Sequence, residues 1–324
     1  MRLIAPDYYR EFRCIADKCR HSCCIGWEID IDPDTREKYR HIPGDFGKRL
    51  NAAIEDGADV SCFRLGENDR CPMLNANGLC DLITALGEES LCQICADHPR
   101  FRNYFSDRTE VGLGLCCEEA ARLILTREAP MQLICLEDDG AEESPNDEEA
   151  ALLALRSALI CIMQNETQPL AIRLDRLLAA VDFTIPDRDW AAVYRELERL
   201  DPTWDGMLDS ISQLTYCAAN RGLSDRPLDP FGGTSTEAKP LHTAWSNFTV
   251  YLLYRHLPGA LNDDDIPGRV AFCVLSTRVL IALCAAKESC TLSDCIEFAR
   301  MYSAEIEYSE DNIAALLDAL WEDD

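Results

Sequence analysis

Residues 14–24 read CIADKCRHSCC, which spaces Cys14, Cys19, Cys23 and Cys24 as C-x4-C-x3-C-C. A second set is spaced C-x8-C-x11-C-x2-C, and an adjacent pair closes the region: Cys71, Cys80, Cys92 and Cys95, then Cys116 and Cys117. With Cys62, eleven of the chain's 18 cysteines lie within its first 117 residues. Thiolates oxidise and bind metals, and few are needed to fill a core. This density indicates disulfides, a metal site or redox chemistry.

The cellular compartment argues against disulfides. The start of the chain, Met1–Asp7, has no long apolar run and no cleavage pattern, so we expect a cytoplasmic protein whose thiols stay reduced. The longest apolar stretch, residues 270–286, is interrupted by Ser276, Thr277 and Arg278, which predicts a buried helix and no membrane span. Metal binding becomes the leading interpretation of the cysteines.

The charge of the chain limits its partners. The formal net charge is -27. The first 125 residues hold 16 Lys and Arg against 22 Asp and Glu, a net -6, so the rest of the chain carries -21. An acidic surface repels nucleic acid and favours basic partners. We therefore expect no nucleic-acid binding.

An acidic segment divides the sequence. Eight of the 13 residues from 137 to 149 are Asp or Glu, with Gly140 and Pro145 among the others, which is typical of a solvated linker. The predicted domains are a cysteine-rich metal-binding or iron–sulfur region at 1–136, this linker at 137–149 and a helical domain at 150–324. The predicted fold is mainly α, with the loop-rich cysteine region packed on an all-α C-terminal domain.

The predicted helices rest on apolar spacing. Leu170, Leu174, Leu177, Leu178 and Val181 fall on one helical face. Similar patterns, or an initial cap, predict helices at 117–125, 150–163, 190–200, 241–257, 269–286 and 292–302, and a last helix capped by Ser309. Alternation of period two is weak, with one short strand expected at 28–32 and a turn at 75–78 that brings Cys71 toward Cys80.

The cysteine spacing fits no common motif. Only Cys92 and Cys95 form a C-x2-C knuckle, so a zinc ribbon is excluded, and Gly26 stands where a radical C-x3-C-x2-C motif needs its third cysteine. What remains is a noncontiguous site in which four thiolates hold zinc or an iron–sulfur cluster. The predicted ligands are drawn from both sets and the closing pair: Cys14, Cys19, Cys23, Cys24, Cys71, Cys80, Cys92, Cys95 and Cys117.

Other candidate residues rank lower. Because Cys23 and Cys24 are adjacent, extended backbone would point their side chains apart. His98 and His21 are weaker ligand candidates. Glu118 is expected to lie in the first turn of a helix, where carboxylates are favoured. His242 and His256 are expected to be structural. Seven later cysteines are expected in helix cores: Cys135, Cys161, Cys217, Cys273, Cys284, Cys290 and Cys295. The chain has no P-loop, no G-x-S-x-G and no complete dinucleotide fingerprint.

Several stretches resemble the flagellin lysine-N-methylase family. They are Tyr9–Ile29 with its cysteines, Cys71-Pro72-Met73-Leu74 through Cys80, Leu91–Phe101 with His98-Pro99-Arg100, 117–125, and Asn247-Phe248 with Tyr254–Pro258. The cysteine blocks are the specific part, and they also resemble a broader superfamily of zinc- or iron-chelating domains that has no single activity.

The resemblance implies S-adenosylmethionine-dependent methylation of lysines on flagellin or another lysine-bearing protein. It also implies a [4Fe–4S] cluster in preference to zinc. An acidic surface suits a cationic substrate. The resemblance does not point to catalytic or cofactor-binding residues, and the glycine-rich loop of common methyltransferases is missing. The alternative is a metal-binding module or metal carrier without catalysis.

Overall fold

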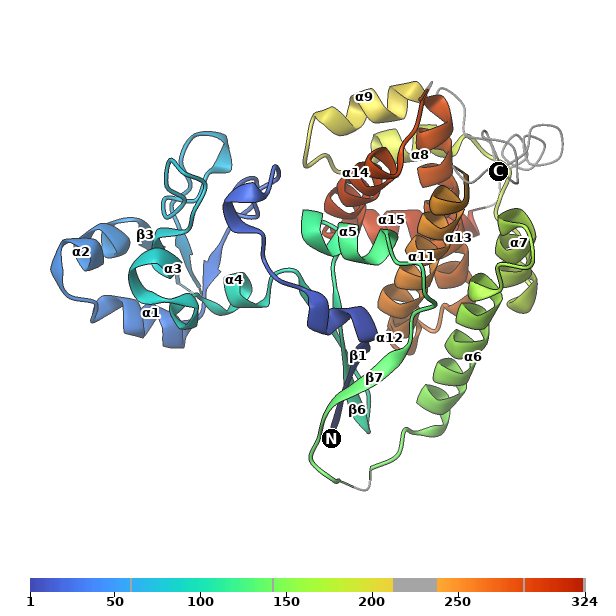
Figure 1. Cartoon of the computed structure of the whole chain (residues 1–324), viewed down its shortest axis with the longest axis horizontal. Helices are drawn as coiled ribbons and strands as arrows, with labels where there is room; N and C mark the ends of the chain where they lie inside the picture. Colours follow the sequence, from blue (N-terminus) through green and yellow to red (C-terminus); the bar gives the residue numbers. More distant parts are fainter. Residues whose placement is uncertain (59, 142, 212–237, 288, 323–324) are drawn as a thin grey trace. The chain divides into compact units, whose positions relative to one another are not determined.

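The computed structural model describes residues 1–58, 60–141, 143–211, 238–287 and 289–322. The chain forms two compact units, each described here by itself. The helical unit comprises Met1–Phe12, Arg102–Cys116 and Ala120–Asp324, and the cysteine unit comprises Arg13–Phe101 and Cys117–Glu119. Figure 1 shows the elements of both units along the chain.

The helical unit contains a small sheet that the sequence pattern did not predict. Its strand order is β5-β6-β1-β7, with β1 parallel to β6 and antiparallel to β7: β5 (Arg100–Tyr104), β6 (Arg108–Leu113), β1 (Arg2–Pro6) and β7 (Leu133–Asp138). The helical prediction holds for the C-terminal half, but the N-terminal half carries this sheet and a second one. Each strand has at most six residues, which leaves little room for a visible alternation, and β1 pairs only with strands more than 100 residues away.

The two units also divide the chain differently from the predicted domains. Strand β7 runs to Asp138, inside the expected linker, and the next helix begins at Asp147. The N-terminal strand β1 lies in the helical unit because it pairs with β7, whose Ile134 faces Ala5. The acidic residues between 139 and 146 therefore connect a strand to a helix within one unit.

Most helices begin and end close to the expected residues: α5 (Glu118–Leu125), α6 (Asp147–Gln164), α7 (Leu170–Ala180), α8 (Trp190–Glu196), α11 (Ala238–His256), α13 (Ile266–Ala286), α14 (Leu292–Tyr302) and α15 (Glu310–Trp321). Two short helices were not predicted, α9 (Thr203–Ser210) and α12 (Ala260–Asp263). Short 3-10 turns and one π-helix complete the set: η1 (Asp7–Glu11), η2 (Ala16–Lys18), η3 (Glu67–Asp69), η4 (Glu88–Ser90), η5 (Leu257–Gly259) and the π-helix η6 (Ser303–Glu307). Ser309 caps α15 as predicted, since its Oγ accepts the Asn312 N–H at 3.2 Å. Helix α8 ends at Glu196, earlier than predicted, and Leu200 beyond it is 49% exposed.

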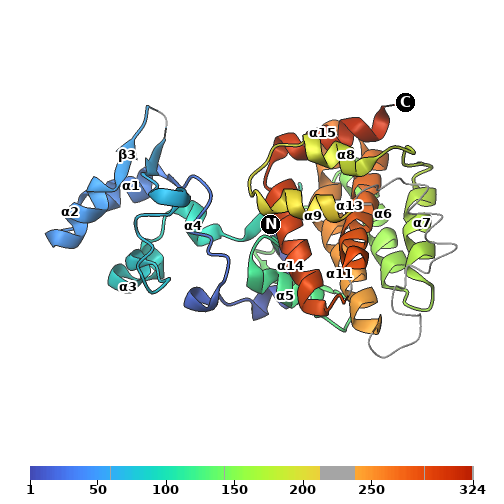
Figure 2. The ribbon, with the colours of Figure 1, turned by 90° about the horizontal axis from the view of Figure 1, so that it is seen from above.

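Helices α11 and α13 form the centre of the helical unit. They pack on each other, and Figure 2 shows them between the α6/α7 pair and α14. Helix α13 is buried on every face, as predicted for this apolar stretch, and the interrupting Ser276, Thr277 and Arg278 are buried with it. It is the one helix in the described part of the chain that is long and apolar enough to cross a membrane, but 78% of that stretch is buried inside the unit. Because most of this stretch is buried, its apolar composition is that of a core helix.

A buried ion pair joins this bundle to the sheet. Arg156 of α6 donates from Nη2 to Glu110 Oε1 of β6 at 2.7 Å, and both side chains are almost completely buried. The Arg156 guanidinium also lies 5.1 Å from the centre of the Tyr254 ring on α11. One side chain thus links α6, α11 and the sheet, and such pairs are stable only while both charges are present.

The cysteine unit has a small three-stranded sheet and four short helices: β2 (Asp30–Ile31), β4 (Ser61–Phe63), β3 (Ile54–Asp56), α1 (Pro33–Arg40), α2 (Gly44–Ala52), α3 (Asp81–Leu86) and α4 (Gln93–Asp97). The strand expected at 28–32 is observed, and Asp32 ends it by capping α1 through the Thr35 N–H at 2.9 Å. The second oxygen of Asp32 accepts the Gln93 N–H at 2.8 Å, so the same carboxylate fixes the start of α4. The core of the cysteine unit includes Ile29, Ile31 and the thiols of Cys71 and Cys92.

Candidate functional site

Five of the predicted ligands meet in the core of the cysteine unit. We call them the inner thiol group: Cys24, Cys71, Cys80, Cys92 and Cys95. The Cys71 thiol lies in the electrostatic field of the Cys24, Cys80 and Cys92 thiols, and the Cys95 thiol lies in that of Cys92, Cys24 and Cys71. Cys71 and Cys92 are buried and the other three are partly exposed. The structure therefore brings together both sequence sets.

Local structure explains why these thiols converge. The backbone N–H of Cys71 donates to the Cys24 carbonyl at 2.8 Å, which joins the two sequence sets. The predicted turn is present: Asn75 Oδ1 accepts the Asn77 N–H at 2.9 Å and the Leu79 N–H at 3.1 Å, and Leu74 then bridges to Cys80. Cys80 and Cys92 each stand directly before the first residue of a helix, α3 and α4.

The inner group holds a hydrogen-bonded thiol pair. Cys92 and Cys95, the C-x2-C knuckle, share a side-chain hydrogen bond that lowers the pKa of Cys92 and raises that of Cys95. Burial raises the pKa of the Cys71 thiol to about 12. A thiol must lose its proton to become a thiolate ligand, and metal binding drives this loss.

The remaining four predicted ligands form a second set, the outer thiol group: Cys14, Cys19, Cys23 and Cys117. The Cys23 thiol lies in the field of Cys14 and Cys117, and the Cys19 thiol lies in that of Cys117 and Cys14. Cys14 and Cys23 are exposed, and Cys19 and Cys117 are partly exposed. The outer group is therefore accessible to solvent, unlike Cys71 and Cys92.

Glu118 borders the outer group. Cys19 Sγ lies 3.8 Å from Glu118 Oε2, and that carboxylate accepts both the backbone N–H and the Nε–H of Arg20 at 2.9 Å. Burial alone would raise the pKa of Glu118, but the bonds from Arg20 outweigh it and hold this pKa below its ordinary value. Glu118 thus holds Arg20 in place and is also the first residue of α5.

The two groups meet at Cys23 and Cys24. The expectation that these side chains point apart is wrong, because the residues lie in a turn closed by the Ile25 N–H and the Ser22 carbonyl at 3.2 Å. Their thiols share a hydrogen bond, which lowers the pKa of Cys24 to about 7 and raises that of Cys23. Cys23 and Cys24 therefore form a second hydrogen-bonded thiol pair.

The cysteine sulfurs are donors that suit a soft metal ion, but they do not surround a common centre. No three His, Cys, Asp or Glu side chains among the described residues are arranged so that they could hold a metal ion. One zinc ion needs its four sulfurs at 2.3 Å from a common centre, whereas the thiolates of an iron–sulfur cluster each bind a different iron and stand farther apart.

Of the weaker ligand candidates, His21 borders the outer group through its carbonyl, which accepts from Cys19 Sγ at 3.2 Å. The His98 ring faces Trp27 at 6.0 Å, and burial lowers its pKa to about 4. Cys62 lies on β4, beside Glu28. In the helical unit, Cys273, Cys284, Cys290 and Cys295 are buried as expected.

Two of the seven later cysteines do not lie in the core as expected. Cys135 and Cys161 are exposed because they occupy the solvent-facing sides of β7 and α6. Cys217 lies outside the described residues.

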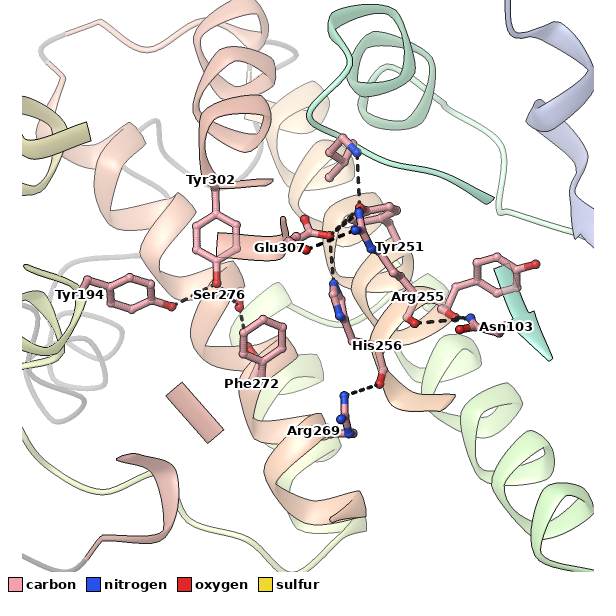
Figure 3. A network of polar contacts seen from close by, with 12 residues as sticks. Asn103, Tyr194, Tyr251, Arg255, His256, Arg269, Phe272, Ser276, Tyr302 and Glu307 are labelled. Atoms are coloured by element: carbon pink, nitrogen blue, oxygen red, sulfur yellow. Dashed lines mark hydrogen bonds and ion pairs between the residues drawn. The ribbon is translucent and has the colours of Figure 1, made fainter. Parts of the chain in front are cut away.

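The helical unit contains a buried polar network that the sequence analysis missed. Glu307 lies in the π-helix η6 and is completely buried. Its Oε2 accepts from Tyr251 Oη at 2.6 Å and from His256 Nε2 at 2.9 Å, and it forms an ion pair with Arg255 Nη1 at 3.0 Å (Figure 3). Its Oε1 has no hydrogen-bond partner among the described residues. A π-helix and a buried carboxylate with three polar partners are features often found at functional sites.

This network also organises neighbouring elements. Tyr251 Oη accepts the Leu115 N–H at 3.3 Å and the Arg255 Nη1–H at 2.7 Å. The His256 carbonyl accepts from Arg269 Nη1 of α13 at 3.0 Å. His256 was expected to be structural, and these contacts give it that role. We therefore interpret the network as a brace between α11, α13 and η6.

His256 makes the stability of the helical unit depend on pH. Burial lowers the pKa of His256 below its ordinary 6.5, with Arg255 and Arg269 adding to the shift and Glu307 opposing it. Below about pH 6.5 the unfolded chain binds a proton that the folded chain excludes, so stability falls as pH decreases from that value. Glu307, whose pKa is lowered mainly by Arg255 against its burial, stays ionised in this range.

We expect the urea midpoint of unfolding to drop between pH 7.5 and 5.5, and to drop less for His256→Gln, which keeps an N–H donor. Other histidines contribute equally to both proteins and cancel in the comparison. An identical pH dependence for the two proteins would contradict a buried neutral His256.

Known proteins resemble part of the chain. A lysine-N-methylase of Salmonella choleraesuis (strain SC-B67) is 27% identical over 141 residues, which are 40% of this chain and 33% of that protein. A lysine-N-methylase of Salmonella typhimurium (strain LT2) is 28% identical over 136 residues, with the same two shares. The flagellar biosynthetic protein FliU of Salmonella muenchen is 26% identical over 141 residues, which are 40% of this chain and 79% of FliU.

The predicted resemblance to the flagellin lysine-N-methylase family is confirmed. The match spans about a third of the length of the two lysine-N-methylases. No family profile matches the chain, and no solved structure matches it.

Proposed function

We propose that this chain is an S-adenosylmethionine-dependent lysine N-methyltransferase that acts on flagellin and carries a thiolate-bound iron–sulfur cluster. The observation that carries the proposal is the match of 40% of the chain to two proteins named lysine-N-methylase. The flagellar name of the third relative favours flagellin as the acceptor. The net charge of -27 favours a lysine-bearing partner through electrostatic attraction.

The proposed reaction places two demands on the protein. The lysine ammonium must first lose a proton, because only the neutral amine has a lone pair to attack the sulfonium methyl group. The N–C bond then forms as the C–S bond breaks, and S-adenosylhomocysteine leaves. The protein must bind the amine, accept its proton and align the two reacting atoms, which alone accelerates such a step strongly.

We assign the proposed cluster to the thiols of the cysteine unit, and we assign the methyl donor to no described residue. The hollow between α1 and residues 86–91 has a volume of about 190 Å³, which is below the usual range for a ligand pocket. A bound cluster would cross-link the loops around the inner thiol group and stabilise the cysteine unit. We assign it this structural role and route no step of methyl transfer through it.

The proposal is tested by methyl transfer. Anaerobically purified chain, incubated with flagellin and methyl-labelled S-adenosylmethionine, should produce methylated lysines that peptide mass spectrometry locates. Flagellin with acetylated lysines is the matched control and should stay unlabelled, because its amines cannot attack. If metal-replete chain transfers no methyl group to either protein, the catalytic assignment fails and the metal-binding module becomes the better account.

A further inference from the structure

Strand β7 leaves one edge of the sheet in the helical unit open. The strand order ends at β7, which pairs with β1 on one side and packs closely on no other described element. Its residues, Leu133–Asp138, include no Pro and no Lys, two residue types that commonly block pairing at an edge strand. An open edge of this kind can accept a further strand through main-chain hydrogen bonds.

The register shows which main-chain groups of β7 face outward. The Asp7 N–H donates to the Gln132 carbonyl at 2.8 Å, just past the end of the β1–β7 ladder and in its register. These two residues therefore form a hydrogen-bonded pair, and such pairs alternate with non-bonded ones along an antiparallel ladder. Leu133 and Cys135 fall in non-bonded pairs, so their N–H and C=O groups point away from β1.

The side chains along this edge include apolar surface that a further strand would cover. Ile134 and Leu136 are partly buried, and Leu133, which points to the other face of the strand, is 41% exposed. Cross-strand neighbours on both faces would remove part of this surface from water. Main-chain pairing and apolar contact would thus act together.

Charge identifies the kind of strand that fits the edge. Residues 128–155, which contain β7, hold nine Asp and Glu and no Lys, Arg or His, and Glu137 and Asp138 at the end of β7 are exposed. Pairing with a second copy of this chain would bring two such stretches together against their repulsion, whereas a lysine-bearing strand is attracted. The opposite edge strand, β5, carries Arg100 and Arg102 and repels lysines.

We propose that the open edge of β7 binds an extended, lysine-bearing segment of the methyl acceptor, flagellin, as an added strand. The inference rests on the proposed function for the identity of the acceptor, and it concerns docking of the acceptor, not the methyl-transfer step. The main-chain groups of Leu133 and Cys135 supply the hydrogen bonds, and the acidic residues before and after β7 supply the attraction.

Thiol alkylation followed by peptide mass spectrometry tests the site on wild-type chain, purified without oxygen and free of S-adenosylmethionine. Cys135 and Cys161 are both exposed and both belong to the helical unit. Saturating flagellin should slow the alkylation of Cys135 severalfold and leave that of Cys161, the internal control, unchanged. Flagellin with acetylated lysines should bind more weakly and protect Cys135 less, because its positive charges are lost.

Variants of the edge test the same site by calorimetry. Cys135→Pro removes an outward N–H at an edge position that tolerates proline, and it should raise the Kd for flagellin about tenfold, as expected for one main-chain hydrogen bond left unmade. Cys135→Ser keeps the N–H and should bind like wild type. Glu137→Lys should weaken binding, most at low ionic strength, whereas Glu310→Lys makes the same charge change on α15 and should have little effect.

The outcomes separate this inference from the proposed function. Circular dichroism would check the fold of each variant, and the alkylation result on wild-type chain decides if Cys135→Pro is unfolded. Equal alkylation rates of Cys135 with and without flagellin, equal Kd values for folded Cys135→Pro and Cys135→Ser, or wild-type dimers that Cys135→Pro dissociates would overturn the inference. Binding at β7 without methyl transfer would contradict only the proposed function, and methyl transfer that is equal in the two Cys135 variants would contradict only this inference.

Discussion

Replacing Glu307 by glutamine should lower the free energy of unfolding of the helical unit by about 3–5 kcal/mol, the usual cost of removing one partner of a buried ion pair. The variant keeps the shape of the side chain but leaves the Arg255 guanidinium, whose side chain is 12% exposed, without its carboxylate. Tyr251 and His256 also lose the charged oxygen that now accepts their hydrogen bonds. The measurement is urea unfolding followed by circular dichroism.

Two further variants make this test specific. Glu310→Gln removes a nearby carboxylate on the exposed start of α15 and should change the midpoint little. The double variant Glu307→Gln/Arg255→Gln should be less destabilised than the sum of its single variants, because it leaves no uncompensated buried charge. Strict additivity, or equal effects of Glu307→Gln and Glu310→Gln, would rule out the brace.

Removing the metal should unfold the cysteine unit while the helical unit stays folded. The core of the cysteine unit is small, and small domains of this kind depend on metals or disulfides for stability. Binding of a structural zinc contributes about 10–16 kcal/mol in comparable thiolate sites, more than such a core supplies. The α11/α13 core of the helical unit contains none of the nine proposed ligands.

Limited proteolysis with mass spectrometry would follow both units in one sample. After anaerobic chelation, cleavage within residues 13–101 should become at least tenfold faster, whereas α6, α11 and α13 should remain protected and act as the internal control. Readdition of metal should restore protection. Equal cleavage rates with and without metal would show that the cysteine unit folds without it.

The sequence predicted the elements whose signals are local. The apolar spacing of Leu170 to Leu178 predicted α7, the hydroxyl of Ser309 predicted the start of α15, and the Asn75–Gly78 turn predicted the approach of Cys71 to Cys80. In each case the interaction that shapes the backbone lies within a few residues, so the pattern is readable without the fold.

The features that the sequence did not predict depend on distant contacts. Glu307 lies in an acidic stretch that looks like a solvated surface, and it meets His256, 51 residues earlier, only because of η6. Spacing identified the nine candidate thiols but not their division, since Cys117 joins Cys14 and Cys23 across more than 90 residues. The β1–β7 pairing joins the ends of a 138-residue stretch and crosses the predicted domain boundary.

The central claim, that the cysteine thiols bind metal, is tested most directly on wild-type chain purified without oxygen. Metal and sulfide analysis, a visible absorption spectrum and thiol titration of the native protein would be made on one sample. The account predicts bound iron with sulfide and a brown colour, or bound zinc in a colourless protein, with the ligand thiols protected from the titrant until metal is removed. A metal-free folded protein whose accessible thiols, including Cys14 and Cys23, all react at once would contradict it.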